Sequence, residues 1–412
     1  MASKTKKQSR QRESSFSLIL ISLTVGIISL LQNKYGQFSD IRGFYGMHFF
    51  DGQHLWPFSE KTLLGETTVR HPVEYPALTG LIMWLLSFFV SPSDTAIYSY
   101  YRLTASLQII LFTYSAYLIY KLAGKKYAFY FILAPAVLYS LNRNWDIWAI
   151  APMLVAILLF ERKKYGLSAV LLAISIATKF FPIVLMLPIA IIFLREKNLF
   201  AFIKYGAVTL VSWVLINLPF AIVNLKGWAY FYEFSAKRGL GSASFYEITS
   251  IIFKSIKFNS IHFYILNITI FLIVTLFLIR LKQIPNLLES SFFVMFAFIL
   301  FNKQYSMQYV IWLSALAVLA ISQISKRQRE SIIYIYILWQ ALELAFQYAF
   351  FQNILTNTYA KTETPMTIQV STTAYAYIGV IRYLVAVIFA LILAKYLRSK
   401  NSCLLYTSPS PR

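Results

Sequence analysis

The chain has 412 residues, of which 58% are apolar, 17% aromatic and 13% charged, whereas soluble domains are roughly 45–50% apolar and about 25% charged. With a mean hydropathy of +0.61, the composition excludes a soluble globular protein, and also disordered, collagen-like and disulfide-framework proteins. Long apolar runs separated by short basic clusters predict an all-α, polytopic membrane protein with a single membrane domain over residues 15–400.

The net charge is +22, from 38 Lys and Arg against 16 Asp and Glu. In a soluble protein this surplus would suggest a nucleic-acid partner. Here the basic residues cluster in short loops between apolar runs, which is typical of cytoplasmic anchors. We therefore expect membrane lipids as partners and no nucleic acid, with part of the surplus available to an anionic lipid substrate.

The two ends of the sequence carry different signals. Residues 1–14 are basic, and the apolar run Phe16–Leu31 follows without an Ala-x-Ala site, which predicts a retained first helix and a cytoplasmic N-terminus. At the other end, Ser402–Arg412 contains the sole cysteine, Cys403, and resembles translated adapter or vector sequence. We exclude this tail from the prediction of the fold.

Residues 32–74 form a long polar segment that we expect outside the cell, because it follows an outward first helix. Aromatic residues among its charges, such as Phe44, Tyr45 and Trp56, predict short amphipathic helices on the bilayer surface. Twelve more apolar runs follow between Ala77 and Leu397, so the prediction is about 11–13 transmembrane or re-entrant helices. The 14-residue run Ala77–Val90 reaches roughly 21 Å as a helix, short of a ~30 Å core, which favours a short or re-entrant segment.

Two polar features at helix ends are candidates for chemistry. Asp40 follows the first helix, where a carboxylate can act as a general base on a hydroxyl, although position alone favours a helix cap or a solvated loop residue. Asn144, Trp145 and Asp146 lie in a tight turn between two apolar runs. This turn is either an ordinary connection with an interfacial tryptophan or a set of groups that bind sugar hydroxyls.

Several charged residues lie within or beside the apolar runs. Lys179 separates two short runs and has no acid beside it in sequence; an unpaired lysine at membrane depth costs at least ~2.5 kcal/mol, so we expect an anionic partner, a lipid phosphate, or snorkelling to the interface. Lys237 and Arg238 end an aromatic loop that serves either as an aromatic belt or as a sugar platform with a phosphate-binding end. Glu343 is an intramembrane acid, expected to be paired or protonated in the lining of a cavity.

Nucleotide and metal motifs are missing from the sequence. It has no Walker A loop, no Rossmann glycine fingerprint and no His-Glu-x-x-His. We therefore expect no coupling to ATP and a mechanism without metal or cofactor.

An ordered set of short motifs resembles the GT-C superfamily of membrane glycosyltransferases, and within it glycosyltransferase family 87, which includes polyprenol-phosphate-mannose-dependent mannosyltransferases. The matching stretches are the Asp40 segment, Val73-Glu74-Tyr75-Pro76-Ala77-Leu78, Asn144-Trp145-Asp146, Thr178-Lys179-Phe180-Phe181-Pro182 and Ser306-Met307-Gln308-Tyr309-Val310-Ile311-Trp312-Leu313. Ala77 and Met307 stand where the family often has proline, so the subgroup stays open.

The resemblance implies a multi-pass enzyme of the plasma membrane that transfers a hexose, with mannose as the commonest precedent, from a polyprenyl-phosphate donor to a lipid or glycan acceptor at the outer face. Asp40 would be the base of an inverting reaction. Cations for the donor phosphate would be Lys179, Lys303, Lys237, Arg238 and Arg42. Sugar or acceptor contacts would come from Asn144, Trp145, Asp146, Glu74, Tyr75, Gln308, Tyr309 and Glu343. The rival interpretation is a transporter or flippase for a lipid-linked sugar, which also needs a polar cavity.

Overall fold

The computed structural model describes residues 2–34, 36, 38–49, 54, 56–59, 61–62, 69–359 and 369–403. Part of the predicted outer segment and residues 404–412 of the adapter-like tail therefore lie outside the described residues. The chain divides into two compact units: a first unit of residues 1–133, 138–183 and 200–238, and a second unit of residues 134–137, 184–199 and 239–412.

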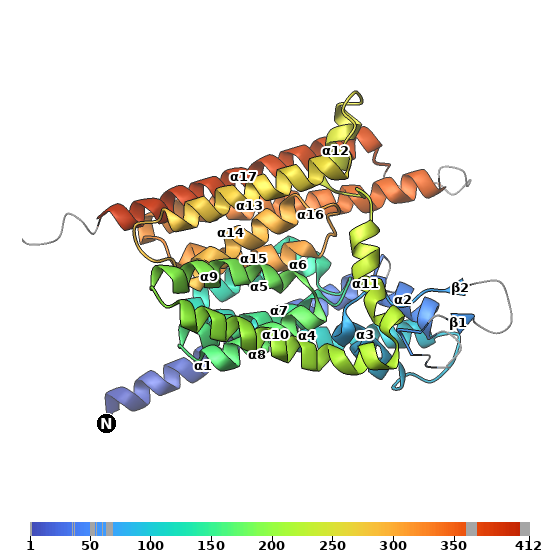
Figure 1. Cartoon of the computed structure of the whole chain (residues 1–412), viewed down its shortest axis with the longest axis horizontal. Coiled ribbons are helices and arrows are strands. Elements are labelled where there is room, and N and C mark those ends of the chain that lie inside the picture. Colours follow the sequence, from blue (N-terminus) through green and yellow to red (C-terminus); the bar gives the residue numbers. More distant parts are fainter. Residues whose placement is uncertain are drawn as a thin grey trace, which may run out of the picture. The chain divides into compact units, whose positions relative to one another are not determined.

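The first unit contains most of the N-terminal half of the chain (Figure 1). Its helices are α1 (Ala2–Gln32), α2 (Asp40–His48), α3 (Ala77–Ser87), α4 (Ala96–Ala123), α5 (Lys125–Ile132), α7 (Asp146–Glu161), α8 (Tyr165–Thr178), α10 (Leu199–Val223) and α11 (Leu225–Lys237). Two short strands, β1 (Lys61–Thr62) and β2 (Val69–Arg70), pair antiparallel with Lys61 opposite Arg70.

The second unit is built from helices of the C-terminal half together with α9 (Met186–Arg195). The others are α12 (Phe245–Ile252), α13 (Ser260–Ile279), α14 (Leu287–Leu300), α15 (Tyr309–Ser322), α16 (Lys326–Tyr359) and α17 (Thr372–Cys403). Helix α6 (Pro135–Ser140) and a 3₁₀ helix (Phe181–Leu185) cross the boundary between the units.

Six helices in the described ranges are long and apolar enough to cross a membrane, which confirms the prediction of a helical, multi-pass membrane protein. These spans are Ser15–Gln32, Ala96–Ala123, Leu199–Val223, Ser260–Ile279, Lys326–Asn357 and Thr372–Ser399. The segment predicted to be short or re-entrant is α3, whose 11 residues reach only about 16 Å, half of a ~30 Å hydrocarbon core.

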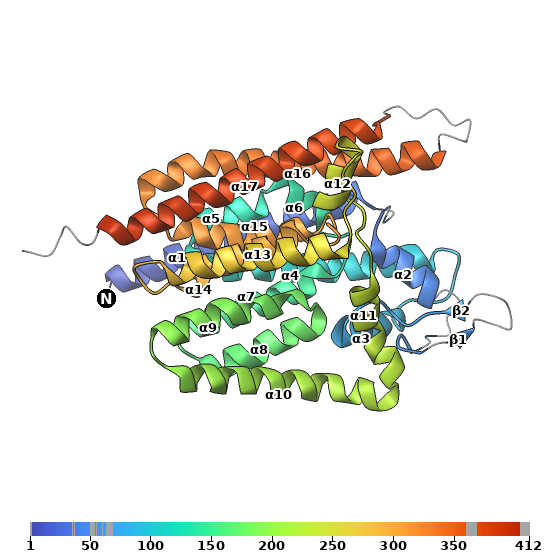
Figure 2. The same ribbon diagram turned by 45° about the horizontal axis from the view of Figure 1, so that its top comes forward.

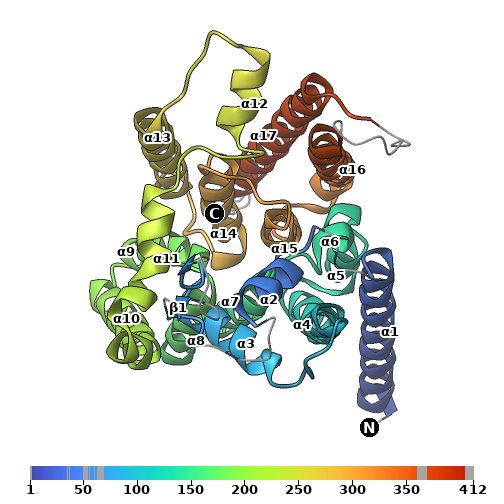
Figure 3. The ribbon, with the colours of Figure 1, turned by 90° about the vertical axis from the view of Figure 1, so that its right-hand side faces the viewer.

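Small residues allow the helices of the first unit to pack closely. A Cβ added at Gly26 of α1 would lie 2.5 Å from the Ile109 side chain on α4, so the glycine permits the close approach typical of membrane helices. Figure 3 shows α1, α4 and α5 side by side. Helix α10 lies beside α8 (Figure 2), where the hydroxyls of Ser168 and Tyr205 are 2.9 Å apart.

The α7–α8 hairpin positions the polar end of the first unit. Two buried hydroxyls join its helices: Ser168 Oγ donates to the Ala156 carbonyl at 2.8 Å, and Ser175 Oγ donates to the Ala149 carbonyl at 2.7 Å. Helix α7 begins at Asp146 and α8 ends just before Lys179. Because the two helices run antiparallel, the start of α7 and the end of α8 lie at the same end of the hairpin.

Candidate functional site

The start of α2 is tied to the turn that precedes α7, although about a hundred residues separate them in the sequence. The Asp40 backbone N–H donates to the Arg143 carbonyl at 2.8 Å. Ser39 Oγ donates to the Asn142 carbonyl at 3.0 Å and shares the Arg143 carbonyl at 3.1 Å. These bonds satisfy a backbone N–H at the start of α2 and two carbonyl groups of the turn. The Asp40 carboxylate, at the first position of α2, is therefore held beside the turn.

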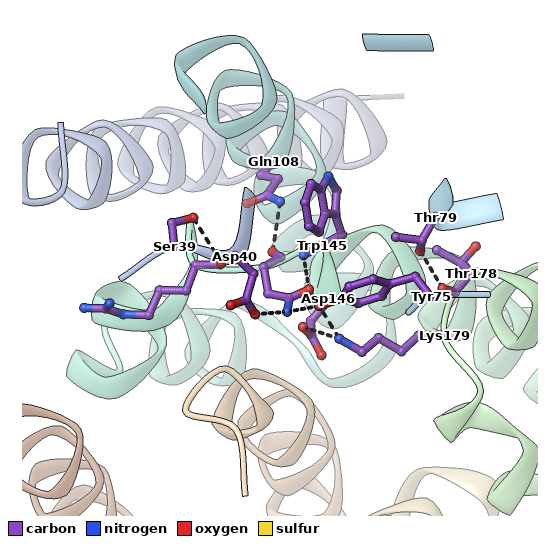
Figure 4. Close-up of polar contacts among 11 residues, drawn as sticks. Ser39, Asp40, Tyr75, Thr79, Gln108, Trp145, Asp146, Thr178 and Lys179 are labelled. Carbon is purple, nitrogen blue, oxygen red and sulfur yellow. Dashed lines mark hydrogen bonds and ion pairs between the residues drawn. The ribbon is translucent and has the colours of Figure 1, made fainter. Parts of the chain in front are cut away.

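Asn144 is the centre of a hydrogen-bonded network that joins three parts of the first unit. Figure 4 shows the side chains of Asp40, Tyr75 and Lys179, which belong to this network. Its Nδ2 group donates at 2.5 Å to both Asp40 Oδ2 and the Tyr75 hydroxyl. Its Oδ1 atom accepts from the Trp145 backbone N–H at 2.6 Å and from Lys179 Nζ at 3.4 Å. Its own carbonyl accepts from Gln108 Nε2 at 2.9 Å. Every polar group of this side chain is thus engaged.

Lys179 has the anionic partner that its position in the sequence required. Its Nζ atom lies 2.8 Å from Asp146 Oδ2, and both side chains are buried. Lys179 itself is extended at the end of α8, where its N–H donates to the Ser175 carbonyl at 2.9 Å. Thr79 on α3 donates to the Thr178 carbonyl at 2.5 Å, which ties α3 to the same point.

Aromatic rings form the wall beside this network. Trp145 is fully buried, and its ring centroid lies 6.0 Å from that of Phe44 and 5.7 Å from that of Tyr75, both in edge-to-face geometry. The Lys179 ammonium lies 5.2 Å from the centre of the Tyr75 ring, within the range of a cation–π interaction. The network therefore contains a buried ion pair and packs against aromatic rings.

Asp40 combines solvent exposure with strong desolvation. Its side chain retains exposed surface, yet the protein atoms around it displace enough water that burial raises the pKa of its carboxyl above the ordinary 3.8. The hydrogen bond from Asn144 and the charges of Lys179 and Arg143 oppose this rise, whereas the charge of Asp146 adds to it. The result is an exposed residue whose carboxyl takes up a proton more readily than a free aspartate.

The structure brings five of the predicted site residues into direct contact: Asp40, Tyr75, Asn144, Asp146 and Lys179. Trp145 packs beside them. Glu74, the neighbour of Tyr75, instead lies 3.8 Å from the His71 imidazole.

Three further predicted cations of the first unit have other local partners. The Arg42 guanidinium lies 4.8 Å from the centre of the Tyr98 ring. Lys237 lies 3.3 Å from Glu233 in an exposed pair, and the Arg238 guanidinium lies 5.4 Å from the Phe234 ring centre. Their predicted phosphate contacts stay predictions.

Four predicted residues belong to the second unit. The buried ammonium of Lys303 lies 5.2 Å from the Phe263 ring centre, Gln308 is buried, and the Tyr309 ring lies 6.0 Å from that of Tyr305. Glu343 is fully buried and ion-paired with Arg382 at 3.2 Å. It also accepts hydrogen bonds from Tyr305 at 3.1 Å and Trp339 at 3.0 Å, which are the contacts expected of a structural acid.

Sequence reasoning missed Arg143 as a charged member of the site. Its side chain is buried, its guanidinium stacks 4.3 Å from the centre of the Tyr139 ring, and its Nη1 atom donates to the Phe38 carbonyl at 3.4 Å. The signal was available, because Arg143 lies beside Asn144 in the turn already singled out. Within the described residues, no group of three His, Cys, Asp or Glu side chains could hold a metal ion.

Comparisons with known proteins give a fold-level likeness. No family model and no curated protein matches the chain. The chain is similar to the crystal structure of ArnT from Cupriavidus metallidurans bound to undecaprenyl phosphate, with a TM-score of 0.46 and 12% identity over 94% of this chain and 77% of that one. The apo structure of the same protein gives a TM-score of 0.44 and 13% identity over 94% and 76% of the two chains.

Proposed function

We propose that the protein is a membrane glycosyltransferase that moves a hexose, with mannose as the first candidate, from a polyprenyl-phosphate donor to a lipid or glycan acceptor at the outer face of the plasma membrane. The observation that carries this proposal is Asp40, an exposed residue whose carboxylate is held by Asn144 beside the Lys179–Asp146 pair. The motif resemblance to family 87 includes the same residues, which supports this reaction class over others.

Asp40 is suited to be the general base. It has exposed surface through which an acceptor hydroxyl can approach, and its raised pKa makes it a better proton acceptor than a free aspartate. In the proposed reaction, the acceptor oxygen attacks the anomeric carbon as its proton passes to Asp40. The bond between that carbon and the phosphate oxygen breaks, and polyprenyl phosphate leaves with the electron pair. A single displacement inverts the anomeric centre.

The leaving phosphate is already anionic, so it needs a cation more than it needs a proton. Lys179 fits this role, because its ammonium has three N–H donors and the bonds to Asp146 and Asn144 use two of them. Asp146 would orient the ammonium while the third N–H contacts a phosphate oxygen. Arg42, Lys237, Arg238 and Lys303 are further candidates for the phosphate, and Tyr75 for the sugar or acceptor.

A covalent product distinguishes this enzyme from a flippase. The purified protein in proteoliposomes is incubated with a panel of polyprenyl-phosphate sugars, beginning with the mannose form, and with extracted membrane lipids as acceptors. We expect a new glycolipid or glycan whose anomeric configuration is opposite to that of the donor. Movement of donor across the bilayer without any covalent product, over the whole panel, would contradict the proposal and favour transport.

A further inference from the structure

The amide of Asn144 has contacts that differ from those of a group waiting for a sugar. Its Oδ1 atom and its Nδ2 group both make hydrogen bonds to other groups of the protein. We infer that Asn144 is a positioning residue, which fixes the Asp40 carboxylate in the orientation and ionisation state that proton transfer requires. This inference rests on the proposed role of Asp40 as the base, and it replaces the predicted sugar contact of Asn144 with a contact to the base.

The surrounding bonds permit only one orientation of the amide. Its Oδ1 atom faces two donors, the Trp145 N–H and the Lys179 ammonium. Its Nδ2 group faces the Asp40 carboxylate, which accepts only. A flipped amide would set an oxygen against a carboxylate and an N–H against an ammonium. The Lys179–Asp146 pair thereby fixes Asn144, and Asn144 in turn fixes Asp40.

The groups that act on Asp40 come from several elements, and α4 also packs against α2, where the Arg42 guanidinium faces Tyr98 and Tyr45 stacks on Tyr100. Asp146 belongs to α7, Lys179 follows α8, and Arg143 and Asn144 lie in the turn before α7. Tyr75, which precedes α3, accepts a hydrogen bond from the Asn144 amide. Of these, Asn144 makes the hydrogen bond to the carboxylate, whereas Lys179, Arg143 and Asp146 act through charge.

Removal of the hydrogen bond from Asn144 should raise the pKa of Asp40. A hydrogen bond that donates to a carboxylate favours the charged form, so its loss favours the proton. Without the Asn144 amide, only the charges of Lys179 and Arg143 oppose the rise that burial causes in the pKa of Asp40. Asp40 therefore takes up its proton at higher pH. If the Asn144 side chain had a purely structural role, its removal would leave the titration midpoint of Asp40 unchanged.

The composition of the chain makes that titration directly measurable. Aspartate occurs at only four positions, Asp40, Asp51, Asp94 and Asp146. The full-length protein with ¹³C in its aspartate carboxyls, in lipid nanodiscs, gives four signals whose shifts report ionisation as the pH is varied. The Asp40→Asn variant assigns the signal of Asp40, and no substrate is required.

The test compares two buried asparagines of the same turn. Asn144→Leu removes the amide at nearly constant volume; Asn142→Leu is the control, since Asn142 Nδ2 donates to Ser29 on α1 at 3.2 Å instead. We expect the Asp40 midpoint to move to higher pH in the Asn144 variant and to stay unchanged in the Asn142 variant. An unchanged midpoint in the Asn144 variant, or an equal shift in both, overturns the inference. If Asn144→Leu does not fold, Asn144→Ala takes its place with the same two criteria.

Activity gives an independent second readout. In the transfer assay at a pH where Asp40 is ionised in both proteins, Asn144→Leu should lower kcat about 100-fold, the usual effect of a misplaced catalytic group, with little change in KM. A rise in KM at constant kcat would return Asn144 to substrate binding and overturn its role as a positioning residue. If the titration shifts but wild-type protein transfers no sugar, the proposed function fails while the hydrogen-bond relation stands.

Discussion

Lys179 and Asp146 form a buried ion pair, 2.8 Å between Nζ and Oδ2, across the open end of the α7–α8 hairpin. Each residue alone would leave an uncompensated charge in an apolar environment, which costs several kcal/mol. The pair therefore allows the Lys179 ammonium to lie beside Asn144, close enough that its charge lowers the pKa of Asp40. This relation links the packing of α7 against α8 to the chemistry of the site.

Breaking this pair on one side should destabilise the protein. Lys179→Met leaves the Asp146 carboxylate buried and unpaired, and we expect a loss of about 3–5 kcal/mol, read as a lower midpoint of thermal unfolding in detergent. The double variant Lys179→Met with Asp146→Leu removes both charges and should recover most of that stability. It should still lack affinity for a polyprenyl-phosphate donor. Full recovery of donor binding in the double variant would remove Lys179 from phosphate recognition.

The pH dependence of transfer should reflect the raised pKa of Asp40. A general base works only when ionised, so kcat/KM should fall as the pH drops through the pKa of Asp40. Because burial raises that pKa above 3.8, the acid limb should lie at higher pH than for a free aspartate. The measurement is a pH series of initial rates at constant lipid composition. A rate that stays level down to pH 4 would contradict this assignment.

The ion pair of Glu343 with Arg382 should be structural and far more sensitive to single than to double substitution. Both side chains are fully buried, and the Arg382 guanidinium also stacks 3.8 Å from the Tyr383 ring centre and 4.0 Å from that of Tyr305. Arg382→Met alone should cost about 3–5 kcal/mol, and adding Glu343→Leu should restore much of it. Thermal unfolding of the single and double variants measures this; equal losses would show that the charges do not act as a pair.

Gly227 should resist any side chain. A Cβ at this position would lie 1.6 Å from the Phe58 carbonyl oxygen, so Gly227→Ala forces α11 away from the 56–59 segment, an overpacking cost of typically 1–3 kcal/mol. Gly166→Ala on α8 is the matched control, since its added Cβ meets nothing within 4 Å, and alanine favours a helix. Comparable destabilisation of the two variants would contradict the close contact at Gly227.

The sequence predicted the helical membrane architecture and five members of the polar network, Asp40, Tyr75, Asn144, Asp146 and Lys179, because both depend on local signals. The hydropathy of the runs fixed the spans, and the polar interruptions at Asp40, Asn144–Asp146 and Lys179 marked helix ends. The pairings were beyond a single sequence: Asn144 meets Asp40 across 104 positions and Tyr75 across 69. Such contacts depend on how the helices pack, which local patterns do not encode.

Two arginines show where a physical signal was present and was not used. Arg382 lies in a run read as apolar, and an arginine at membrane depth calls for an acid of the kind that Glu343 supplies. Arg143 lies next to the amide that became the centre of the site. The sequence interpretation thus includes Glu343 without its ion-pair partner Arg382, and Asn144 without the adjacent Arg143.

The most direct test of the account compares two aspartates in the transfer assay. Asp40→Asn removes the proposed base, whereas Asp94→Asn changes an exposed aspartate of the turn between α3 and α4. With both variants folded in proteoliposomes and supplied with the same polyprenyl-phosphate mannose and lipid acceptors, Asp40→Asn should lose at least about 100-fold in transfer, while Asp94→Asn retains wild-type rates. Wild-type transfer by Asp40→Asn would contradict the central claim.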